Sequence, residues 1–298
     1  MQAMLLAAGF GTRLRPYTLI RPKPLFPVLN VPLLHILLDK LILAGCGKIV
    51  VNCHHLAYQI KAAVADRPEV ILQYEPEILG TGGSLRKALP LFDNGPVLVM
   101  NGDIYHDLNV MDLLAHHQSH DFPVTMAMHD YPRFNSVHVR EEKVIAFADN
   151  HLKPGGGILA FTGIHILQRH IIERIPEQGF FHIIDLYKQL AGEGQIGSMR
   201  IDDCFWQDIG TPEDYLDLHR ALLCKGKSND ECRYWHISTK ACIEENVELK
   251  EWGAVGPEAK ISSGSSLARC VVWEGAHVDS GQELTDQIVC PEIQAVTK

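Results

Sequence analysis

The side chains best placed to do chemistry in this sequence lie in a loop near its start. Arg13, Arg15 and Lys23 follow two glycines, Gly9 and Gly11, and prolines stiffen the segment around them. Glycine lets backbone N–H groups approach a ligand without a Cβ in the way, and the cations bring positive charge to the same loop. Such a loop is typical of a polyphosphate site, whereas a plain glycine turn would not need the cations.

Two familiar phosphate loops do not fit this segment. A Walker loop ends in Gly-Lys-Ser or Gly-Lys-Thr, but this loop has Gly11, Thr12 and Arg13 there. A dinucleotide fingerprint needs a third glycine and an acidic residue about 20 positions later. Position 14 is leucine, and residues 22–32 contain no carboxylate. The loop therefore indicates another class of phosphate-binding protein.

Two aspartates, Asp103 and Asp208, follow apolar segments that we interpret as strands. Asp103 comes after the run at 97–100, and Asp208 comes shortly after Phe205 and Trp206. The carboxyl end of a strand is where a doubly wound sheet binds its ligands. Taken alone, an aspartate at such a place is more often a turn or helix-cap residue.

Apolar runs and helical patterns alternate along much of the chain. We expect strands at 3–8, 48–53, 69–74, 96–101 and 123–129. We expect helices between them at 32–44, 56–66, 83–91 and 109–118. This alternation predicts an α/β fold with a mostly parallel sheet covered on both faces.

The segment after this alternation is more mixed. Residues 136–147 have the pattern of a hairpin. Further strands are expected at 158–166, 196–201 and 204–207, with a helix near 182–191. Thr211 provides a hydroxyl cap and Pro212 a first-turn proline, which predicts a helix that runs to about Leu223.

The last part of the chain has a different sequence pattern. The polar segment 224–231 is a candidate linker, and after it aliphatic residues recur about every six positions. This spacing is typical of a parallel β-helix, whose coils stack their apolar faces. The alternative is a small irregular β-domain, since segments such as 248–252 break the repeat. About three coils would fit, which is a small number for a stack that stands alone. We therefore expect the tail to pack on the first domain or on another subunit, and the second case would give a homo-oligomer.

Charge and composition exclude several classes of protein. The net charge of −9 argues against a nucleic-acid partner. No apolar run approaches the roughly 18 residues needed to span a membrane. The first strand begins at residue 2, which leaves no room for a signal peptide. We therefore expect a cytoplasmic protein with no membrane partner.

Cysteines and histidines give weaker signals. The eight cysteines include no Cys-x-x-Cys pair, so we expect reduced thiols that pack as small hydrophobes. Zinc could be considered at Cys53-His54-His55 and at the histidines in 116–120. Both groups lack a complete set of ligands at a plausible spacing, and we interpret them as structural or surface residues.

Several segments together resemble the sugar-1-phosphate nucleotidyltransferase family. The matching segments, in order, are LAAGFGTRLRP at 6–16, PKP at 22–24, LGTGG at 79–83, NGD at 101–103 and WQDIGTPEDY at 206–215. The resemblance covers about residues 1–223. It implies a Rossmann-like mixed, mostly parallel sheet flanked by helices as the catalytic domain at 1–223, a linker at 224–231, and a short left-handed β-helix-like domain at 232–298.

The resemblance also implies a reaction and roles for the loop. In this family a sugar 1-phosphate attacks the α-phosphorus of a nucleoside triphosphate and releases pyrophosphate. Arg13 would clamp the triphosphate, and Lys23 would bridge the α-phosphate and the sugar phosphate. Backbone groups of the loop would surround the nucleotide, namely those of Ala8, Gly9, Gly11 and Thr12.

Further site residues follow from the same resemblance. Asp103 and Asp208 would hold Mg²⁺ together with phosphate oxygens and water, because this ion prefers hard oxygen ligands. Gly80, Gly82 and Asn101 would contact the nucleotide, with the glycines against the base.

The predicted sugar site departs from the family pattern. Asp149, Thr162 and Gly163 would line it, but Asn150 stands where many relatives have lysine. Lys153 follows three positions late. The identity of the sugar is therefore the least determined part of the prediction.

Four functions remain open at this point. The main hypothesis is transfer of a guanylyl group from GTP to a mannose-type 1-phosphate. A close alternative is UTP-dependent transfer to N-acetylmuramate or another amino-sugar 1-phosphate. A non-catalytic relative that binds nucleotide sugars is less favoured because Arg13, Lys23, Asp103 and Asp208 are all present. An acyltransferase that acts through the tail is disfavoured because the repeat is short and offers only His277 in its regular coils.

Overall fold

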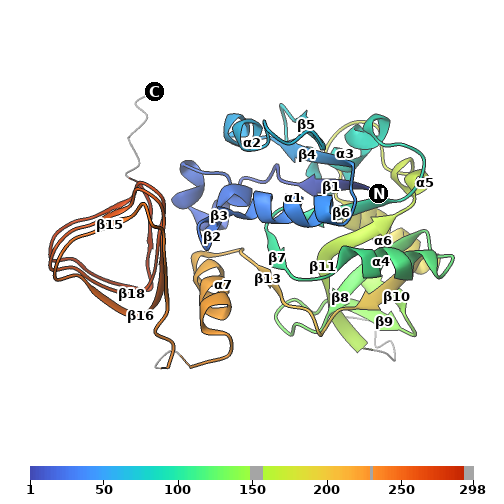
Figure 1. The fold of residues 1–298 in the computed structure, drawn as a ribbon. Coiled ribbons are helices and arrows are strands. Elements are labelled where there is room, and N and C mark those ends of the chain that lie inside the picture. The colour runs from blue at the N-terminus through green and yellow to red at the C-terminus, as the bar shows by residue number, and fades with distance from the viewer. Residues whose placement is uncertain (148–156, 229–230, 292–298) are drawn as a thin grey trace. The chain divides into compact units, whose positions relative to one another are not determined.

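A computed structural model of the chain describes residues 1–147, 157–228 and 231–291 (Figure 1). The chain folds into two compact units. The first, here called the sheet unit, comprises Met1–Phe10 and Leu37–Trp206, and the second, the loop–tail unit, comprises Gly11–Ile36 and Gln207–Lys298.

The sheet unit is built around a mixed sheet of nine strands. Their spatial order is β5 (Val70–Tyr74), β4 (Lys48–Cys53), β1 (Gln2–Leu6), β6 (Val97–Asn101), β11 (Gly157–Leu167), β8 (Val124–His129), β12 (Ile196–Arg200), β10 (Lys143–Phe147) and β9 (Val137–Arg140). Strands β11 and β10 run opposite to the other strands of this path. The predicted α/β fold with a mixed, mostly parallel sheet is confirmed.

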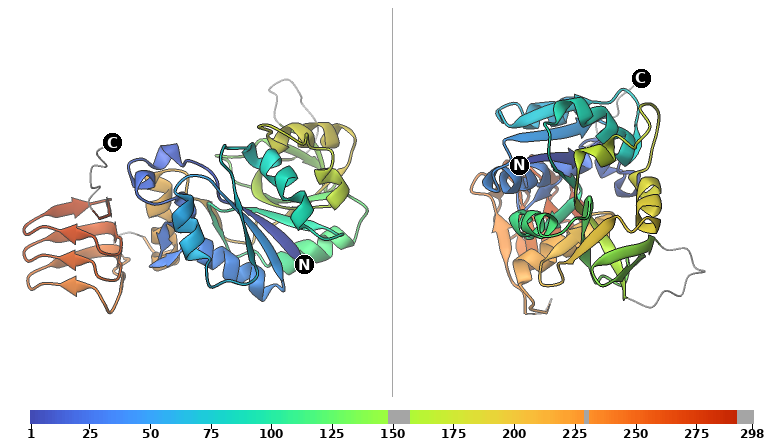
Figure 2. Two further views of the ribbon diagram at one scale, coloured as in Figure 1. Left: turned by 90° about the horizontal axis from the view of Figure 1, so that it is seen from above. Right: turned by 90° about the vertical axis from the view of Figure 1, so that its right-hand side faces the viewer.

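Helices cover both faces of this sheet (Figure 2). They are α1 (Leu33–Leu43), α2 (Ala57–Ala63), α3 (Gly80–Ala88), α4 (Val110–Gln118), α5 (Arg169–Ile172) and α6 (Ile183–Gly192). Apolar side chains of α3 and α6, such as Leu85 and Leu186, join Met4 and Val99 of the central strands in one buried cluster. The short strand β7 (Ile104–His106) and helix α5 were not predicted, because three or four residues are too few for a hydrophobic period to be recognised.

The loop–tail unit begins with short turns rather than long elements. Three 3₁₀ turns, at Thr12–Leu14, Tyr17–Leu19 and Lys23–Leu25, are followed by a small hairpin of β2 (Pro27–Val28) and β3 (Val31–Pro32). The unit resumes near the end of β13 (Trp206–Asp208) and continues into α7 (Pro212–Cys224).

Helix α7 starts as its sequence predicts. The hydroxyl of Thr211 accepts a hydrogen bond from the Asp214 N–H, and the Asp214 carboxylate accepts one from the Thr211 N–H. This reciprocal cap satisfies two N–H groups that the helix itself leaves without partners. The helix start after Asp208 is thereby fixed by local sequence.

The tail consists of short parallel strands in stacked coils. Trp235 pairs with Gly253, and Cys242 pairs with Lys260, in each case 18 residues further along the chain. The strands are β14 (Trp235–Ile237), β15 (Cys242–Ile243), β16 (Glu248–Val255), β17 (Lys260–Ile261), β18 (Ser266–Val272), β19 (His277–Val278), β20 (Glu283–Thr285) and β21 (Ile288–Val289). Three hexapeptides therefore make one coil, and the parallel stacking is the one that the aliphatic spacing indicated.

The irregular segment 248–252 is accommodated by a bulge. The pairing of β16 with β18 shifts between Lys250 and Gly253, and Glu251 adopts a φ of 56°. Arg269, on the next coil, forms an ion pair with Glu251 and donates to Asp286 at 2.6 Å on the coil beyond. The extra residue is thus stabilised by a column of charges at one corner of the stack.

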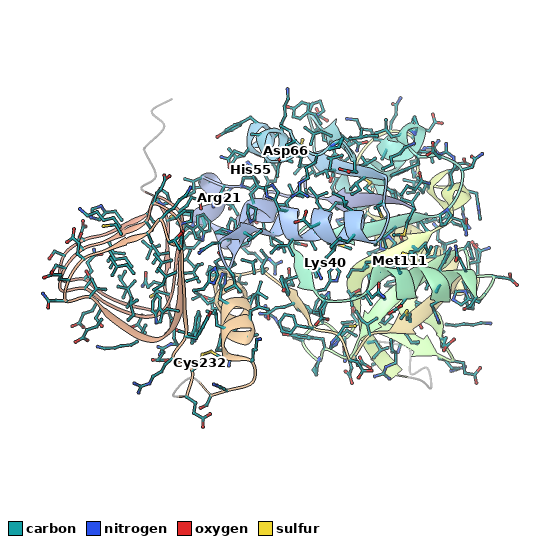
Figure 3. The ribbon with its side chains drawn as sticks, viewed as in Figure 1. Arg21, Lys40, His55, Asp66, Met111 and Cys232 are labelled. Carbon is teal, nitrogen blue, oxygen red and sulfur yellow. A yellow bond between two sulfur atoms is a disulfide. The ribbon has the colours of Figure 1, made fainter. Side chains whose placement is uncertain are left out.

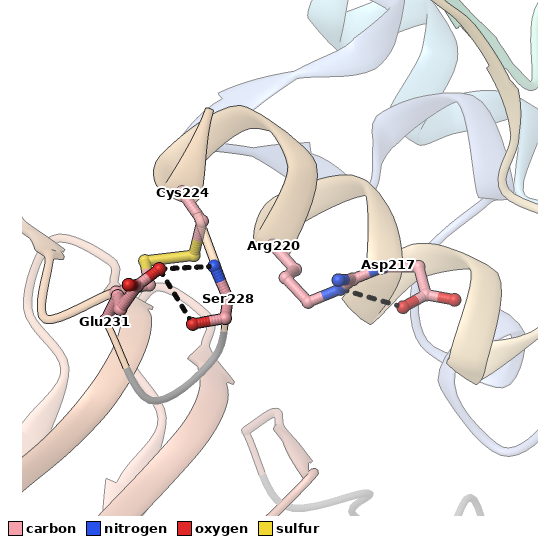
Figure 4. Close-up of a disulfide and its surroundings, with 6 residues drawn as sticks. Asp217, Arg220, Cys224, Ser228 and Glu231 are labelled. Atoms are coloured by element: carbon pink, nitrogen blue, oxygen red, sulfur yellow. Dashed lines mark hydrogen bonds and ion pairs between the residues drawn. A yellow bond between two sulfur atoms is a disulfide. The ribbon is translucent and has the colours of Figure 1, made fainter. Parts of the chain in front are cut away.

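One cysteine prediction is wrong. All eight cysteines were expected to be reduced, but Cys224 and Cys232 form a disulfide (Figure 4), with their Cα atoms 5.3 Å apart. The chain turns back after α7, where Glu231 accepts hydrogen bonds from the N–H and hydroxyl of Ser228. That turn brings the two thiols together, which their spacing in sequence alone did not indicate. The six other cysteines are free.

The disulfide spans the segment predicted as a linker. The two compact units divide the chain differently from the predicted domains at 1–223 and 232–298, with the tail grouped with residues 11–36 and 207–224. The predicted domain boundaries stay a prediction. Within the described residues, no helix combines the length and the apolar character required to cross a membrane.

Candidate functional site

The edge of the sheet where β1 and β6 end carries the first group of predicted residues. The two strands are parallel neighbours, and Leu6 pairs with Asn101. The N–H of Gly102 donates to the carbonyl of Leu6 at 2.8 Å. A Cβ on Gly102 would lie 2.8 Å from that same oxygen. Only glycine therefore fits between the two strand ends, and Asp103 follows it at this edge.

The glycine loop contains a tight turn that also requires glycine. Gly11 has a φ of 60°, and a Cβ there would lie 2.8 Å from the side chain of Thr18. The hydroxyl of Thr18 donates to the carbonyl of Gly11 at 3.0 Å. Leu14 is buried, whereas Arg13 is exposed. The turn thus anchors one side chain in the interior and leaves the guanidinium accessible to an anion.

Lys23 and Asp208 meet although 185 residues separate them in sequence. The Lys23 Nζ lies 3.3 Å from Asp208 Oδ1, and both side chains are largely buried. Burying an ammonium is costly unless an opposite charge accompanies it. Asp208 therefore provides the opposite charge beside the buried ammonium and holds the lysine side chain in place.

The guanidinium of Arg13 and the carboxylate of Asp208 both lie next to Gly210. A Cβ on Gly210 would lie 2.5 Å from Asp208 Oδ2 and 3.1 Å from a guanidinium nitrogen of Arg13. The loop–tail unit therefore brings together three of the four charged residues that the sequence singled out. Asp103 belongs to the sheet unit, and its participation with Arg13, Lys23 and Asp208 in one site stays a prediction.

The predicted base-binding segment lies at the start of α3. Gly80 has a φ of 73°, and the N–H groups of Gly82 and Gly83 donate to the carbonyl of Phe181 at 2.9 and 3.1 Å. A Cβ on Gly82 would lie 2.6 Å from the Phe181 ring. These glycines thus allow the segment around Phe181 to pack closely on the helix start. Base recognition by this segment stays a prediction, and it would use atoms other than these two amides.

The predicted sugar site is described only in part. Gly163 has a φ of 77°, and a Cβ there would lie 2.5 Å from the Asn101 side-chain nitrogen. Thr162 is fully buried, and its hydroxyl donates to the carbonyl of Ala127 at 2.7 Å. These two residues therefore shape the backbone beside Asn101, and their contact with a sugar phosphate stays a prediction. Asp149, Asn150 and Lys153 lie outside the described residues.

The sequence did not reveal a buried polar network below the glycine loop. Asn52, at the end of β4, accepts from the N–H of Ala7 at 2.7 Å and donates to Glu75 Oε1 at 2.9 Å. Gln73 donates to the same carboxylate oxygen at 3.1 Å and to the carbonyl of Ser84 in α3 at 2.9 Å. The network thereby links the end of β1 to α3. The sequence feature that could have revealed the network is Glu75, an acidic residue directly after the predicted strand at 69–74.

The histidines considered for zinc have other roles in the described structure. The Nδ1 of His117 lies 2.7 Å from the Thr125 hydroxyl, and burial lowers the pKa of His117 to about 4. The His116 ring lies edge-on to that of His120. Within residues 1–147, 157–228 and 231–291, no three His, Cys, Asp or Glu side chains gather closely enough to hold a metal by themselves. A hard cation at Asp103 or Asp208 would thus need oxygen ligands from a substrate or from water.

Comparison with known proteins shows which family the chain is similar to. The family model described as nucleotidyl transferase matches residues 2–225. A mannose-1-phosphate guanylyltransferase of Mycobacterium tuberculosis is 28% identical over 295 residues, which cover 94% of this chain and 82% of that protein. A probable mannose-1-phosphate guanylyltransferase 2 of Arabidopsis thaliana is 30% identical, covering 93% of this chain and 83% of its own length. A UTP–glucose-1-phosphate uridylyltransferase of Synechocystis is 27% identical, covering 97% and 87%.

A solved structure shows the same fold. The crystal structure of HddC from Yersinia pseudotuberculosis, also solved in complex with GMP-PN, aligns with a TM-score of 0.62 and 26% identity. The alignment covers 74% of this chain and 99% of that protein.

Proposed function

The chain belongs to the nucleotidyl transferase family and transfers a nucleotidyl group to a sugar 1-phosphate, and on that premise we propose that its substrates are GTP and a mannose-type sugar 1-phosphate. The products are then a GDP-sugar and pyrophosphate. The observation that carries the proposal is the cluster of Arg13, Lys23 and Asp208. Two cations held beside one carboxylate are suited to a triphosphate and a second phosphate.

The choice of guanine and mannose rests on the relatives. Mannose-1-phosphate guanylyltransferases from a bacterium and a plant match almost the whole chain, and HddC was solved with a guanine nucleotide analogue. UTP-dependent transfer to an amino-sugar 1-phosphate is the second candidate. It is supported by the uridylyltransferase relative, while Asn150, at the place where lysine is expected, leaves the identity of the sugar open.

In the proposed mechanism, the protein positions two anions and stabilises charge, and no protein nucleophile is needed. Arg13 and the backbone N–H groups of residues 9–12 bind the triphosphate. Lys23 donates to the α-phosphate and to the incoming sugar phosphate, so that the attacking oxygen faces the phosphorus. Pyrophosphate leaves as the new phosphoanhydride bond forms.

The carboxylates complete this proposal. Asp208 orients the Lys23 ammonium in the free enzyme. The hard oxygen donors of Asp103 and Asp208 are suited to Mg²⁺, which when bound neutralises phosphate charge as the P–O bond breaks. Occupation of such a site would also weaken the hold of Asp208 on Lys23, so that the lysine becomes available to the phosphates.

Three further features belong to the proposal. We assign the tail coils to a left-handed β-helix, as in the family that the sequence resembles. We expect the enzyme to work in the cytoplasm. A homo-oligomer formed through the tail remains part of the prediction.

The substrates can be tested by pyrophosphate release. The full-length protein is incubated with each of the four common nucleoside triphosphates, Mg²⁺, and the 1-phosphates of mannose, glucose, N-acetylglucosamine, N-acetylmuramic acid and heptose. The proposal expects the highest kcat/KM with GTP and mannose 1-phosphate. Highest activity with UTP and an amino sugar would establish the second candidate, and no release with any pair would contradict both.

A further inference from the structure

The tail residue Trp273 contacts the loop that carries the proposed catalytic lysine. Its ring, which is fully buried, lies 5.9 Å from the ring of Tyr17 and 4.7 Å from that of Phe26, measured between centroids. The Arg21 guanidinium lies over the same indole at 4.7 Å. All four residues belong to the loop–tail unit. One side chain of the tail thus contacts the loop both before and after Lys23.

The contact with Phe26 is connected to Lys23 through the backbone. The N–H of Phe26 donates to the carbonyl of Lys23 at 3.0 Å and closes the 3₁₀ turn of Lys23–Leu25. Phe26 is fully buried between Trp273 and Tyr215. The residue that ends the turn of Lys23 is therefore held in place by the packing of its phenyl ring.

Hydrogen bonds orient the aromatic residues of this cluster. The indole N–H of Trp273 donates to the Tyr215 hydroxyl at 3.1 Å, and that hydroxyl donates to the carbonyl of Pro27. The ring of Trp273 is thereby linked to the loop at the residue after Phe26. A phenylalanine at position 273 would keep part of the apolar contact but leave the Tyr215 hydroxyl without this donor.

A charged contact extends the same interface. Glu274, the neighbour of Trp273, accepts from an Arg21 guanidinium nitrogen at 2.9 Å. Asn30 donates to the carbonyl of Val255 in β16 at 3.0 Å. Figure 3 shows Arg21 on the side of the loop that faces the tail. The loop is thus attached to the tail at both of its ends, and Lys23 lies between the attachments.

We propose that Trp273 is a positioning residue for Lys23, so that the tail determines the rate of nucleotidyl transfer within its own chain. The inference rests on the proposed role of Lys23. A group that bridges two reacting phosphates must be held closely, since a displacement of about 1 Å in a reacting geometry can lower a rate by up to about a hundredfold. The stacked coils of the tail contact the loop through Trp273, Glu274 and the carbonyl of Val255. These contacts hold the loop more closely than its own short turns would.

The test compares the same substitution at two buried tryptophans of the tail. Trp252, in β16, is 2% exposed, and within the described residues its indole N–H has no hydrogen-bond partner and its ring contacts no other aromatic ring. Steady-state kinetics and thermal unfolding are measured for Trp273→Phe and Trp252→Phe in the full-length protein. We expect Trp273→Phe to lower kcat about tenfold with little change in the KM for the triphosphate, and Trp252→Phe to change kcat less than about twofold.

A second comparison separates positioning from a general loss of stability. In a Lys23→Met background, Trp273→Phe should cause no further loss of kcat, because the group that it positions is absent. Equal kcat values for the two tryptophan variants, or full additivity with Lys23→Met, would overturn the inference. If Lys23→Met kept normal activity, the proposed role of Lys23 would fail first, and the two failures are thus distinguishable.

A milder pair of variants decides the question if Trp273→Phe does not fold. Glu274→Gln weakens the ion pair with Arg21, whereas Glu251→Gln weakens the ion pair with Arg269 inside the tail. We expect Glu274→Gln to lower kcat about two- to threefold and Glu251→Gln to leave it unchanged. The same kcat for both variants would contradict the proposal.

Discussion

The two compact units hold their site residues in different ways. In the sheet unit, Asp103 is positioned by the parallel pairing of β1 with β6 and by a glycine that fits between the strand ends. In the loop–tail unit, Lys23 lies on a short 3₁₀ turn and pairs with Asp208 at the end of β13, while Trp273 of the tail packs on Phe26 at the end of that turn. The comparison indicates that backbone pairing fixes the first residue, whereas distant side-chain packing fixes the second.

This difference has a consequence for variants. A substitution that disturbs the strand ends should first reduce stability, because the sheet and its buried polar network are disturbed with it. A substitution in the loop that carries Lys23 should first reduce the rate, because the geometry of a few charged groups changes. The following predictions test this division, from the largest effect to the smallest.

The largest effect is expected at the catalytic lysine. Lys23→Met keeps the buried stem but removes the charge where the two phosphates meet. An attraction at about 4 Å is worth roughly 4 kcal/mol at an effective dielectric constant near 20, so kcat should fall at least several hundredfold. Pyrophosphate release is the measurement, and Lys61→Met, at an exposed position of α2, is the control. A loss below tenfold would remove Lys23 from the mechanism.

The polar network of the sheet unit should show the opposite behaviour. Asn52→Leu leaves the buried Ala7 N–H without its acceptor and removes one of the two hydrogen bonds to Glu75 Oε1, the one from Gln73 remaining. The unsatisfied N–H costs about 1–3 kcal/mol and the lost hydrogen bond to the carboxylate about 1 kcal/mol or more, so the free energy of unfolding should fall by about 2–4 kcal/mol. Urea denaturation measures this change, with Asn94→Ala on an exposed turn as the control. An Asn52→Leu protein of normal stability would show that the network does not stabilise the sheet unit.

Removal of the disulfide in the loop–tail unit should have a smaller effect, on the free energy of unfolding. Loss of a crosslink across eight residues, as in Cys224→Ser with Cys232→Ser, should lower the free energy of unfolding by about 2–3 kcal/mol. Thiol titration in denaturant should find six free cysteines before reduction and eight after it. Eight thiols without reductant would show that the bond does not form in the isolated protein.

Two buried histidines allow the units to be compared through pH. Burial lowers the pKa of His165 in the sheet unit to about 3 and that of His219 in α7 to about 4. Because the unfolded value is about 6.5, the folded state binds fewer protons between these values. The contribution of each histidine to the free energy of unfolding is therefore fully present above about pH 6.5. It is lost as the pH falls, by about 2 kcal/mol per histidine at pH 5.

Leucine substitutions separate the two histidines. His165→Leu should remove its share of the pH dependence at little cost at pH 7, because neither of its ring nitrogens has a partner within the described residues. His219 accepts from the Leu29 N–H at 3.3 Å and contacts the Tyr215 carbonyl at 2.9 Å. His219→Leu should therefore also destabilise the protein at pH 7, by about 1–3 kcal/mol. Equal stability of both variants at pH 7 would contradict this distinction.

The sequence alone was sufficient to predict the features that depend on local patterns of residues and on the order of the strands. The α/β sheet, the hairpin of β9 and β10, the cap at Thr211 and the coils of the tail were all predicted. Each depends on a hydrophobic period or on residues a few positions apart. Short elements such as β7 and α5 carry too few residues for such a period, and they were missed.

The sequence was insufficient for contacts between distant residues. The meeting of Lys23 with Asp208 was anticipated only through resemblance to a family, whereas the contact of Trp273 with Phe26 left no local signal. The disulfide between Cys224 and Cys232 was likewise missed, because the turn that brings the thiols together depends on the end of α7 and the start of the tail.

A crystal structure of the protein with a non-hydrolysable GTP analogue, mannose 1-phosphate and Mg²⁺ would test the account most directly. The account predicts that Arg13 and Lys23 lie within hydrogen-bonding distance of the phosphates and that the carboxylates of Asp103 and Asp208 coordinate the cation. A nucleotide bound away from Lys23, or Asp103 and Asp208 on different sides of the ligands, would contradict it.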